Sequence, residues 1–274
     1  MPGELIRILS DVHYGERSSR VRSLDQLRPL FDGATSLLFN GDTFDTRPGP
    51  NPEVTARIRG EVRDFFPTLG LPVTFLTGNH DPDLSPRHLA DLAGGKVFVT
   101  HGDILFDTIV PWGQDVALIC ERMNTATAAL PGWEERPLEE RLRVIRQIAA
   151  SIPQRHQSEQ HPLKYALRFA MDTVWPPTRI VKVLRAWREV PRRAASLLRK
   201  DRPLARFALF GHTHHPGIWR IPSGATVINT GAFCRPFSSF VADLSPGRLL
   251  VRRVTARRGE YRLGGKVADF SLGP

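Results

Sequence analysis

The chain has 274 residues, of which 41% are hydrophobic, and it carries a formal net charge of +10. This length suits one α/β domain with an insertion, and the composition can form a sizeable core. No apolar run is long enough to cross a bilayer, and we expect no signal peptide because Glu4 and Arg7 interrupt the first apolar segment. Two cysteines exclude a disulfide framework, so we expect a cytoplasmic protein.

The first part of the chain alternates short apolar runs with amphipathic ones. Strands are predicted over residues 5–10, 36–40, 73–76 and 96–100, and helices over 21–31, 52–66 and 82–92. This rhythm predicts a layered α/β sheet, in which ligands bind at the carboxyl ends of the strands. Polar residues stand at each of those ends: Asp11 and His13, Asp42, Asn79 to Asp81, and His101.

Some of these polar residues could bind a metal ion, but an ordinary structural role would also explain them. If the chain stays extended, Asp11 and His13 point the same way and can chelate one cation, although a surface pair is the commoner case. Asp42 can bridge two cations through its two oxygens, or cap the next turn. Asp45 is expected to orient a ligand histidine.

The strand rhythm stops over residues 112–204. Helices are predicted over 141–152, 161–174 and 179–198, the last interrupted by Pro191. Residues 134–206 carry 17 Lys+Arg against 8 Asp+Glu, with tryptophans among the arginines. Such a helical insert fits a lid over an apolar phosphorylated ligand, a face on the membrane surface, or a nucleic-acid surface. Packing of helix against helix would account for the aromatic residues equally well.

The strands resume after the insert. A strand over 206–210 leads into His212 and His214, two histidines in a metal-ligand spacing, whereas His215 is expected to face the other way. Four more short strands, over 218–221, 226–229, 239–242 and 249–252, predict an antiparallel C-terminal half.

Carboxylate, imidazole and amide groups together suit Mn, Fe or Zn, with manganese favoured here. Two divalent cations ~3.5–4 Å apart can hold a phosphoryl oxygen and produce a hydroxide nucleophile, and a free imidazole can protonate the leaving oxygen. Five blocks of this kind in one chain resemble the signature of the calcineurin-like metallophosphoesterases. They are Asp11-x-His13, Gly41-Asp42, Gly78-Asn79-His80-Asp81, His101 and Gly211-His212-Thr213-His214.

The resemblance implies a four-layer αββα metallophosphoesterase sandwich. It implies one domain over residues 1–274, with a helical insert at about 112–204 before the last metal-binding block. It also implies the ligands: Asp11, His13 and His214 for one cation, Asn79, His101 and His212 for the other, and Asp42 as the bridge. His80 would be the general acid, Asp81 would orient it, and Asn229-Thr230-Gly231 would support the site.

The insert resembles that of the UDP-2,3-diacylglucosamine diphosphatase branch. The lipid A enzyme usually has arginine where this chain has His80, which favours a relative with a histidine acid. The expected function is hydrolysis of a phosphate ester or pyrophosphate, with a lipid-linked UDP-sugar as one candidate substrate and the basic insert as a candidate contact with the inner membrane. The alternatives are a phosphodiesterase acting on nucleic acid or cyclic nucleotides, and a non-catalytic scaffold.

Overall fold

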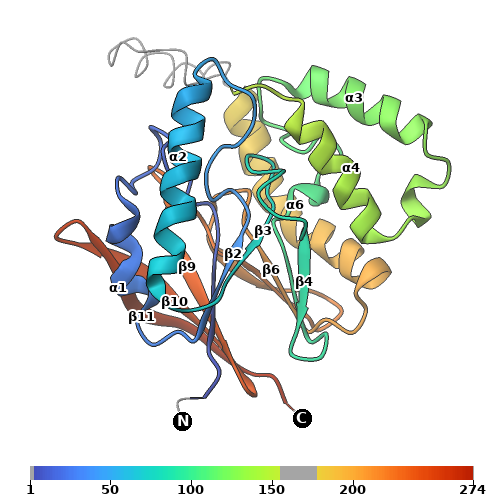
Figure 1. Cartoon of the computed structure of the whole chain (residues 1–274). Coiled ribbons are helices and arrows are strands. Elements are labelled where there is room, and N and C mark those ends of the chain that lie inside the picture. The colour runs from blue at the N-terminus through green and yellow to red at the C-terminus, as the bar shows by residue number, and fades with distance from the viewer. Residues whose placement is uncertain (1–2, 155–177, 274) are drawn as a thin grey trace.

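The computed structural model describes residues 3–154 and 178–273, which form two sheets with helices on both sides (Figure 1). The first sheet has the order β11-β10-β9-β1-β2-β3, in which β1, β2 and β3 are parallel and β9 to β11 are antiparallel. Its strands are β1 (Ile6–Leu9), β2 (Ser36–Asn40), β3 (Val73–Leu76), β9 (Phe240–Ser245), β10 (Arg248–Arg257) and β11 (Glu260–Ser271).

The second sheet has the order β4-β5-β6-β8-β7. Its strands are β4 (Leu89–Leu92), β5 (Val97–Thr100), β6 (Phe207–Phe210), β7 (Gly217–Arg220) and β8 (Thr226–Asn229). β5, β6 and β8 are parallel, and the edge strands β4 and β7 are antiparallel. The C-terminal half is therefore not wholly antiparallel as predicted, because β8 adds to the parallel edge of β6.

Helices cover the outer face of each sheet (Figure 1). They are α1 (Arg28–Phe31), α2 (Pro52–Phe65), α3 (Val116–Ala128), α4 (Leu138–Ala150) and α6 (Thr178–Asp201). α1 and α2 pack on the first sheet, and α4 and α6 pack on the second. The predicted α/β sandwich with four layers in the order αββα is confirmed.

Successive side chains of β1 and β2 point to opposite faces of the first sheet and so enter two different apolar layers. Ile8 and Leu38 lie in the cluster between the two sheets, while their neighbours Leu9 and Phe39 lie in the cluster beneath α1 and α2. Both faces of β1 and β2 are therefore buried, which explains why these strands are continuous apolar runs rather than alternating ones.

The helices of the expected insert form part of the sandwich. α6 buries the stripe Ala186, Val190 and Ala194 against the second sheet, so it supplies the fourth layer of the sandwich. It runs through Pro191 without the predicted interruption, and buried residues on both sides of the proline anchor it to the sheet. α3 and α4 share a small core of their own. The helix predicted over 161–174 falls outside the described residues.

Two other local predictions were wrong. Residues 82–92 form turns and the strand β4 instead of a helix, because Leu89–Leu92 finds a partner along β5. The helix predicted over 21–31 is a 3-10 turn, Leu24–Leu27, followed by the short α1. Among residues 3–154 and 178–273, no helix has both the length and the apolar character needed to cross a bilayer.

Phe39 should be the most costly truncation in the first sheet. It is fully buried, and its ring lies 6.1, 4.9 and 5.3 Å from those of Phe31, Phe66 and Phe75. We expect Phe39→Ala to lower the free energy of unfolding by about 3–5 kcal/mol in a urea titration. Leu204→Ala is the control, since Leu204 is 79% exposed. An equal loss in both variants would contradict this picture of the core.

Candidate metal centre

The predicted ligands meet where the carboxyl ends of both sheets come together. The first sheet contributes the residues that follow β1, β2 and β3, and the second contributes those that follow β5 and β6. Besides a group formed by His13, Glu16 and His80, two groups of predicted ligands result: Asp11, His13, Asp42 and His214 in one, and Asp42, His101 and His212 in the other. Asp42 belongs to both.

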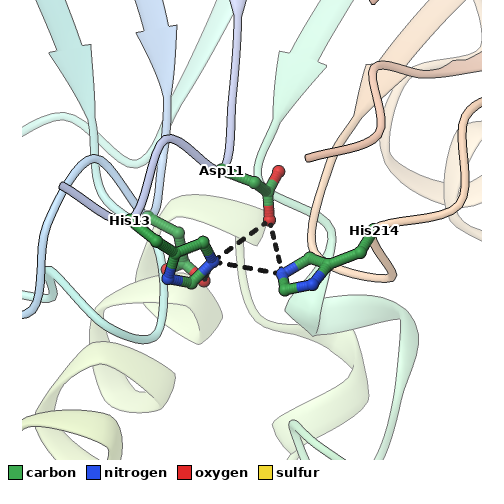
Figure 2. A group of neighbouring side chains, drawn as sticks. Asp11, His13 and His214 are labelled. Carbon is green, nitrogen blue, oxygen red and sulfur yellow. Dashed lines mark hydrogen bonds and ion pairs between the residues drawn. The ribbon is translucent and has the colours of Figure 1, made fainter. Parts of the chain in front are cut away.

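The first group is built from Asp11, His13 and His214, whose ligand atoms face a common point (Figure 2). His13 Nε2 lies 3.1 Å from His214 Nε2 and 3.9 Å from Asp11 Oδ1. His214 Nε2 lies 3.3 Å from the same Asp11 oxygen. One carboxylate oxygen and two ring nitrogens within this space form a suitable ligand set for one divalent cation.

Asp42 joins this group to the second. Its Oδ2 lies 3.6 Å from His13 Nε2 and 3.3 Å from His101 Nε2. Asn79 Oδ1 lies 3.2 Å from the same His101 nitrogen. A carboxylate oxygen shared by the two groups is the arrangement that a bridging ligand of a dinuclear centre requires.

In three of the histidines, one ring nitrogen forms a hydrogen bond away from the centre, which identifies the other nitrogen as the one that can bind a cation. His13 Nδ1 lies 2.8 Å from Glu16 Oε1, His101 Nδ1 3.0 Å from the Asn40 carbonyl, and His212 Nε2 2.8 Å from the Ile109 carbonyl. Each partner only accepts, so that ring nitrogen keeps its hydrogen, and the opposite nitrogen is the one that can bind a cation when the ring is neutral. Metal-ligand histidines are held in this way, and the donor set therefore fits two cations.

The backbone of the ligand loops is also unusual. Asp11, His13, Asp42, His212 and His214 all have φ between 49° and 64°. Side chains other than glycine seldom adopt this left-handed region, and such residues gather at functional sites. The side chains of Asp11 and His13 therefore converge because the backbone forms a tight turn there. The extended conformation expected for these two residues was wrong.

Two motif glycines make room for ligands. A Cβ on Gly78 would lie 2.1 Å from Asp42 Oδ1, and one on Gly211 would lie 2.1 Å from Asp11 Oδ2. No other residue leaves space for the two carboxylates beneath the loops that carry the histidines.

The two buried carboxylates dominate the electrostatics. Burial disfavours charge on His101, but the Asp42 carboxylate more than compensates and raises the pKa of His101 to about 10. Burial, with the charge of His101 beside it, lowers the pKa of His212 to about 4. For Asp42, burial opposes ionisation, yet the nearby imidazoles hold its pKa well below the usual range. A divalent cation would neutralise this concentration of negative charge.

His80 sits at the rim of the centre, its ring 4.9 Å from that of His13. Its Nδ1 lies 3.1 Å from Asp45 Oδ2 and 3.3 Å from Glu16 Oε1. The two carboxylates favour a proton on Nδ1 against the Arg47 guanidinium, whose Nη2 lies 3.0 Å from this nitrogen, and Nε2 is left as the atom that can serve a substrate.

Asp81 does not orient His80, contrary to the prediction from its sequence neighbourhood. Its carboxylate accepts backbone N–H groups from Asp42, Thr43 and Gly78, at 3.0, 2.7 and 2.5 Å. Asp81 therefore ties together the loops that carry Asp42 and Asn79. Asp45 takes the place beside His80, so it orients this residue and not a ligand histidine.

Asn229 supports the site from the second sheet. Its Nδ2 donates to the Gly211 carbonyl, at 2.6 Å, and to Thr213 Oγ1, at 3.0 Å. His215 turns away and stacks on Trp187, with ring centroids 4.4 Å apart.

Two residues at the site, Glu16 and Arg47, were not predicted from the sequence. Glu16 contacts both His13 and His80, and its only signal is a carboxylate three positions after a candidate ligand. Arg47 Nη2 lies 2.6 Å from Asp45 Oδ2 and 3.0 Å from His80 Nδ1. Nothing in the local sequence around Arg47 predicts these contacts.

The calcineurin-like phosphoesterase family model matches residues 5–216, which span every ligand block. The chain therefore belongs to this family. No curated protein matches the chain.

Several solved structures are similar at low identity. A dimetal phosphatase from Danio rerio is 16% identical with a TM-score of 0.47, covering 99% of each chain. Vps29 from Entamoeba histolytica, complexed with Zn²⁺, is 12% identical with a TM-score of 0.42, covering 98% of this chain and 99% of that one. A predicted phosphoesterase from Streptococcus pneumoniae is 12% identical with a TM-score of 0.40, covering 99% of each.

Glu16→Gln should weaken metal binding. The amide can turn its NH₂ toward His13 Nδ1 and disturb the tautomer that presents Nε2, so we expect about a 10–100-fold loss of Mn²⁺ affinity by calorimetric titration. Glu61→Gln is the control, because within the described part of the chain the Glu61 carboxylate contacts Tyr14 and Arg57 and not a candidate ligand. Unchanged Mn²⁺ affinity in Glu16→Gln would show that His13 needs no such partner.

Proposed function

We propose that this protein is a dinuclear metal-dependent phosphohydrolase that cleaves a phosphate ester or pyrophosphate bond. The observation that carries the proposal is the position of Asp42 Oδ2, 3.6 Å from His13 Nε2 and 3.3 Å from His101 Nε2. A carboxylate shared by two ligand groups is the feature that separates a two-metal centre from a single site.

The ligand sets follow from the two groups. Asp11, His13 and His214 would hold one cation, Asn79, His101 and His212 would hold the other, and Asp42 would lie between them. Manganese is our proposal for the native metal, with iron or zinc as alternatives. Bound divalent cations supply positive charge for phosphoryl oxygens and a hydroxide nucleophile at neutral pH.

His80 is the proposed general acid. Glu16 and Asp45 face its Nδ1, and together with Asp42 they raise its pKa well above the usual value, although burial and Arg47 act in the opposite direction. The imidazolium form therefore persists near neutral pH. Its Nε2–H can then donate to the oxygen of the leaving group, and the carboxylates stabilise the ring while it carries charge.

The insert points to an anionic substrate with an apolar part. On α6, the apolar side chains Ile180, Val181 and Leu184 are exposed beside exposed Lys182 and Arg185. This mixed surface would suit a lipid-linked nucleotide sugar, including one that the protein meets at a membrane surface. The substrate we propose is therefore a lipid-linked UDP-sugar pyrophosphate.

The function is tested by turnover with Mn²⁺. We expect the purified protein to hydrolyse bis-p-nitrophenyl phosphate, to lose this activity in EDTA, and to regain it with Mn²⁺. A panel of UDP-lipids, cyclic nucleotides and single-stranded DNA then identifies the substrate class. Activity confined to DNA, with steep salt dependence, would favour a nuclease instead. Two bound cations without turnover of any ester would indicate a non-catalytic scaffold.

The role of His80 is separable from metal binding. We expect His80→Ala to lower the rate about 10²–10⁴-fold while metal content stays near that of the unchanged protein, because a general acid contributes on this scale and His80 is not a ligand. Asp42→Ala should instead lose metal, as measured by elemental analysis. A His80→Ala variant that loses its cations would make His80 a ligand and overturn the assignment.

A further inference from the structure

Arg146, on helix α4 of the insert, is buried beneath the candidate metal centre with only 3% of its surface exposed. Its guanidinium group binds two segments that are distant in the sequence. Nε donates to Thr77 Oγ1 at 2.8 Å and Nη2 to the Thr77 carbonyl at 3.0 Å. Nη2 also donates to Asp103 Oδ1 at 3.0 Å, and Nη1 contacts Asp103 Oδ2.

These two partners flank the ligands of one cation only. Thr77 directly follows β3 and precedes Gly78 and Asn79, and Asp103 lies two residues after His101. Asn79 Oδ1 and His101 Nε2 are 3.2 Å apart, so their alignment depends on how the two loops sit relative to each other. A single guanidinium group that binds both loops fixes that relation.

The chemistry of the contact suits this role. A planar guanidinium group can bind a carboxylate through two nitrogens and still offer Nε to a third acceptor, which a lysine ammonium cannot do in the same geometry. The Asp103 side chain is fully buried, so it needs a charged partner at this position.

We propose that Arg146 is a positioning residue by which helix α4 aligns Asn79 and His101, so that the second cation binds only when the insert is docked. This inference rests on the dinuclear centre of the proposed function and goes beyond it. It makes the insert part of the metal centre as well as a surface for substrate. The first cation, held by Asp11, His13 and His214, does not depend on Arg146.

The experiment counts Mn²⁺ in the full chain by elemental analysis after dialysis, and follows spin coupling between the two ions by electron paramagnetic resonance. We expect Arg146→Met to keep one Mn²⁺ with an uncoupled spectrum, and Arg146→Lys to bind the second ion about 10–100-fold more weakly. Arg141→Met is the matched control: Arg141 is a second buried arginine of α4 that contacts the Asp201 carboxylate away from the centre. It should keep two coupled ions.

The outcomes separate the inference from a folding defect and from the proposed function. Circular dichroism identifies an unfolded variant, and the milder Arg146→Lys then decides. If both Arg146 variants bind the second ion like the unchanged protein, the inference is wrong. If the unchanged protein binds two coupled ions but hydrolyses no ester, the proposed function fails while the role of Arg146 is still decided by the ion counts.

Discussion

Two buried carboxylates, Asp11 and Asp42, impose the constraint that the rest of the structure satisfies. Burying an unpaired charge costs several kcal/mol, so each needs partners on every side. Asp11 accepts the backbone N–H of His212 at 3.0 Å, and Asp42 accepts that of His80 at 2.9 Å. Asp42 Oδ2 faces the imidazoles of His13 and His101, whereas Asp11 Oδ2 accepts a hydrogen bond from the Ser10 hydroxyl. The fold therefore concentrates negative charge where two cations can offset it.

Meeting this constraint requires both sheets at once. Asp42 follows a strand of the first sheet, whereas His101 and His212 follow strands of the second. The apolar layer between the sheets includes Ile8 of β1 and Leu209 of β6. It fixes the distance between the two sets of strand ends. The packing between the sheets therefore also sets the positions of the candidate ligands. Because protein interiors are close-packed, neither the spacing of the sheets nor the positions of these side chains can change much.

Local pattern predicted the strands that carry ligands with little error. β2 and β8 begin and end at the residues that the apolar runs indicated, because both faces of these strands are buried and polar residues are confined to their ends. β3 also has the predicted bounds, although most of its residues are only half-buried. The segment 82–92 was misread because the pairing of β4 with β5 decides its structure, and pairing across a sheet leaves no mark in the local sequence. β11 was missed for the same reason.

The sequence by itself determined the types of the candidate ligands, their order and the strand ends on which they stand, since each of these is a local property. Only the tertiary structure decided which side chains contact these candidate ligands and their loops. Asp45 took the position beside His80 that adjacency had suggested for Asp81, and Arg146 reached Thr77 and Asp103 across 69 and 43 positions of the chain. Such contacts depend on distances in space, which spacing along the chain does not encode.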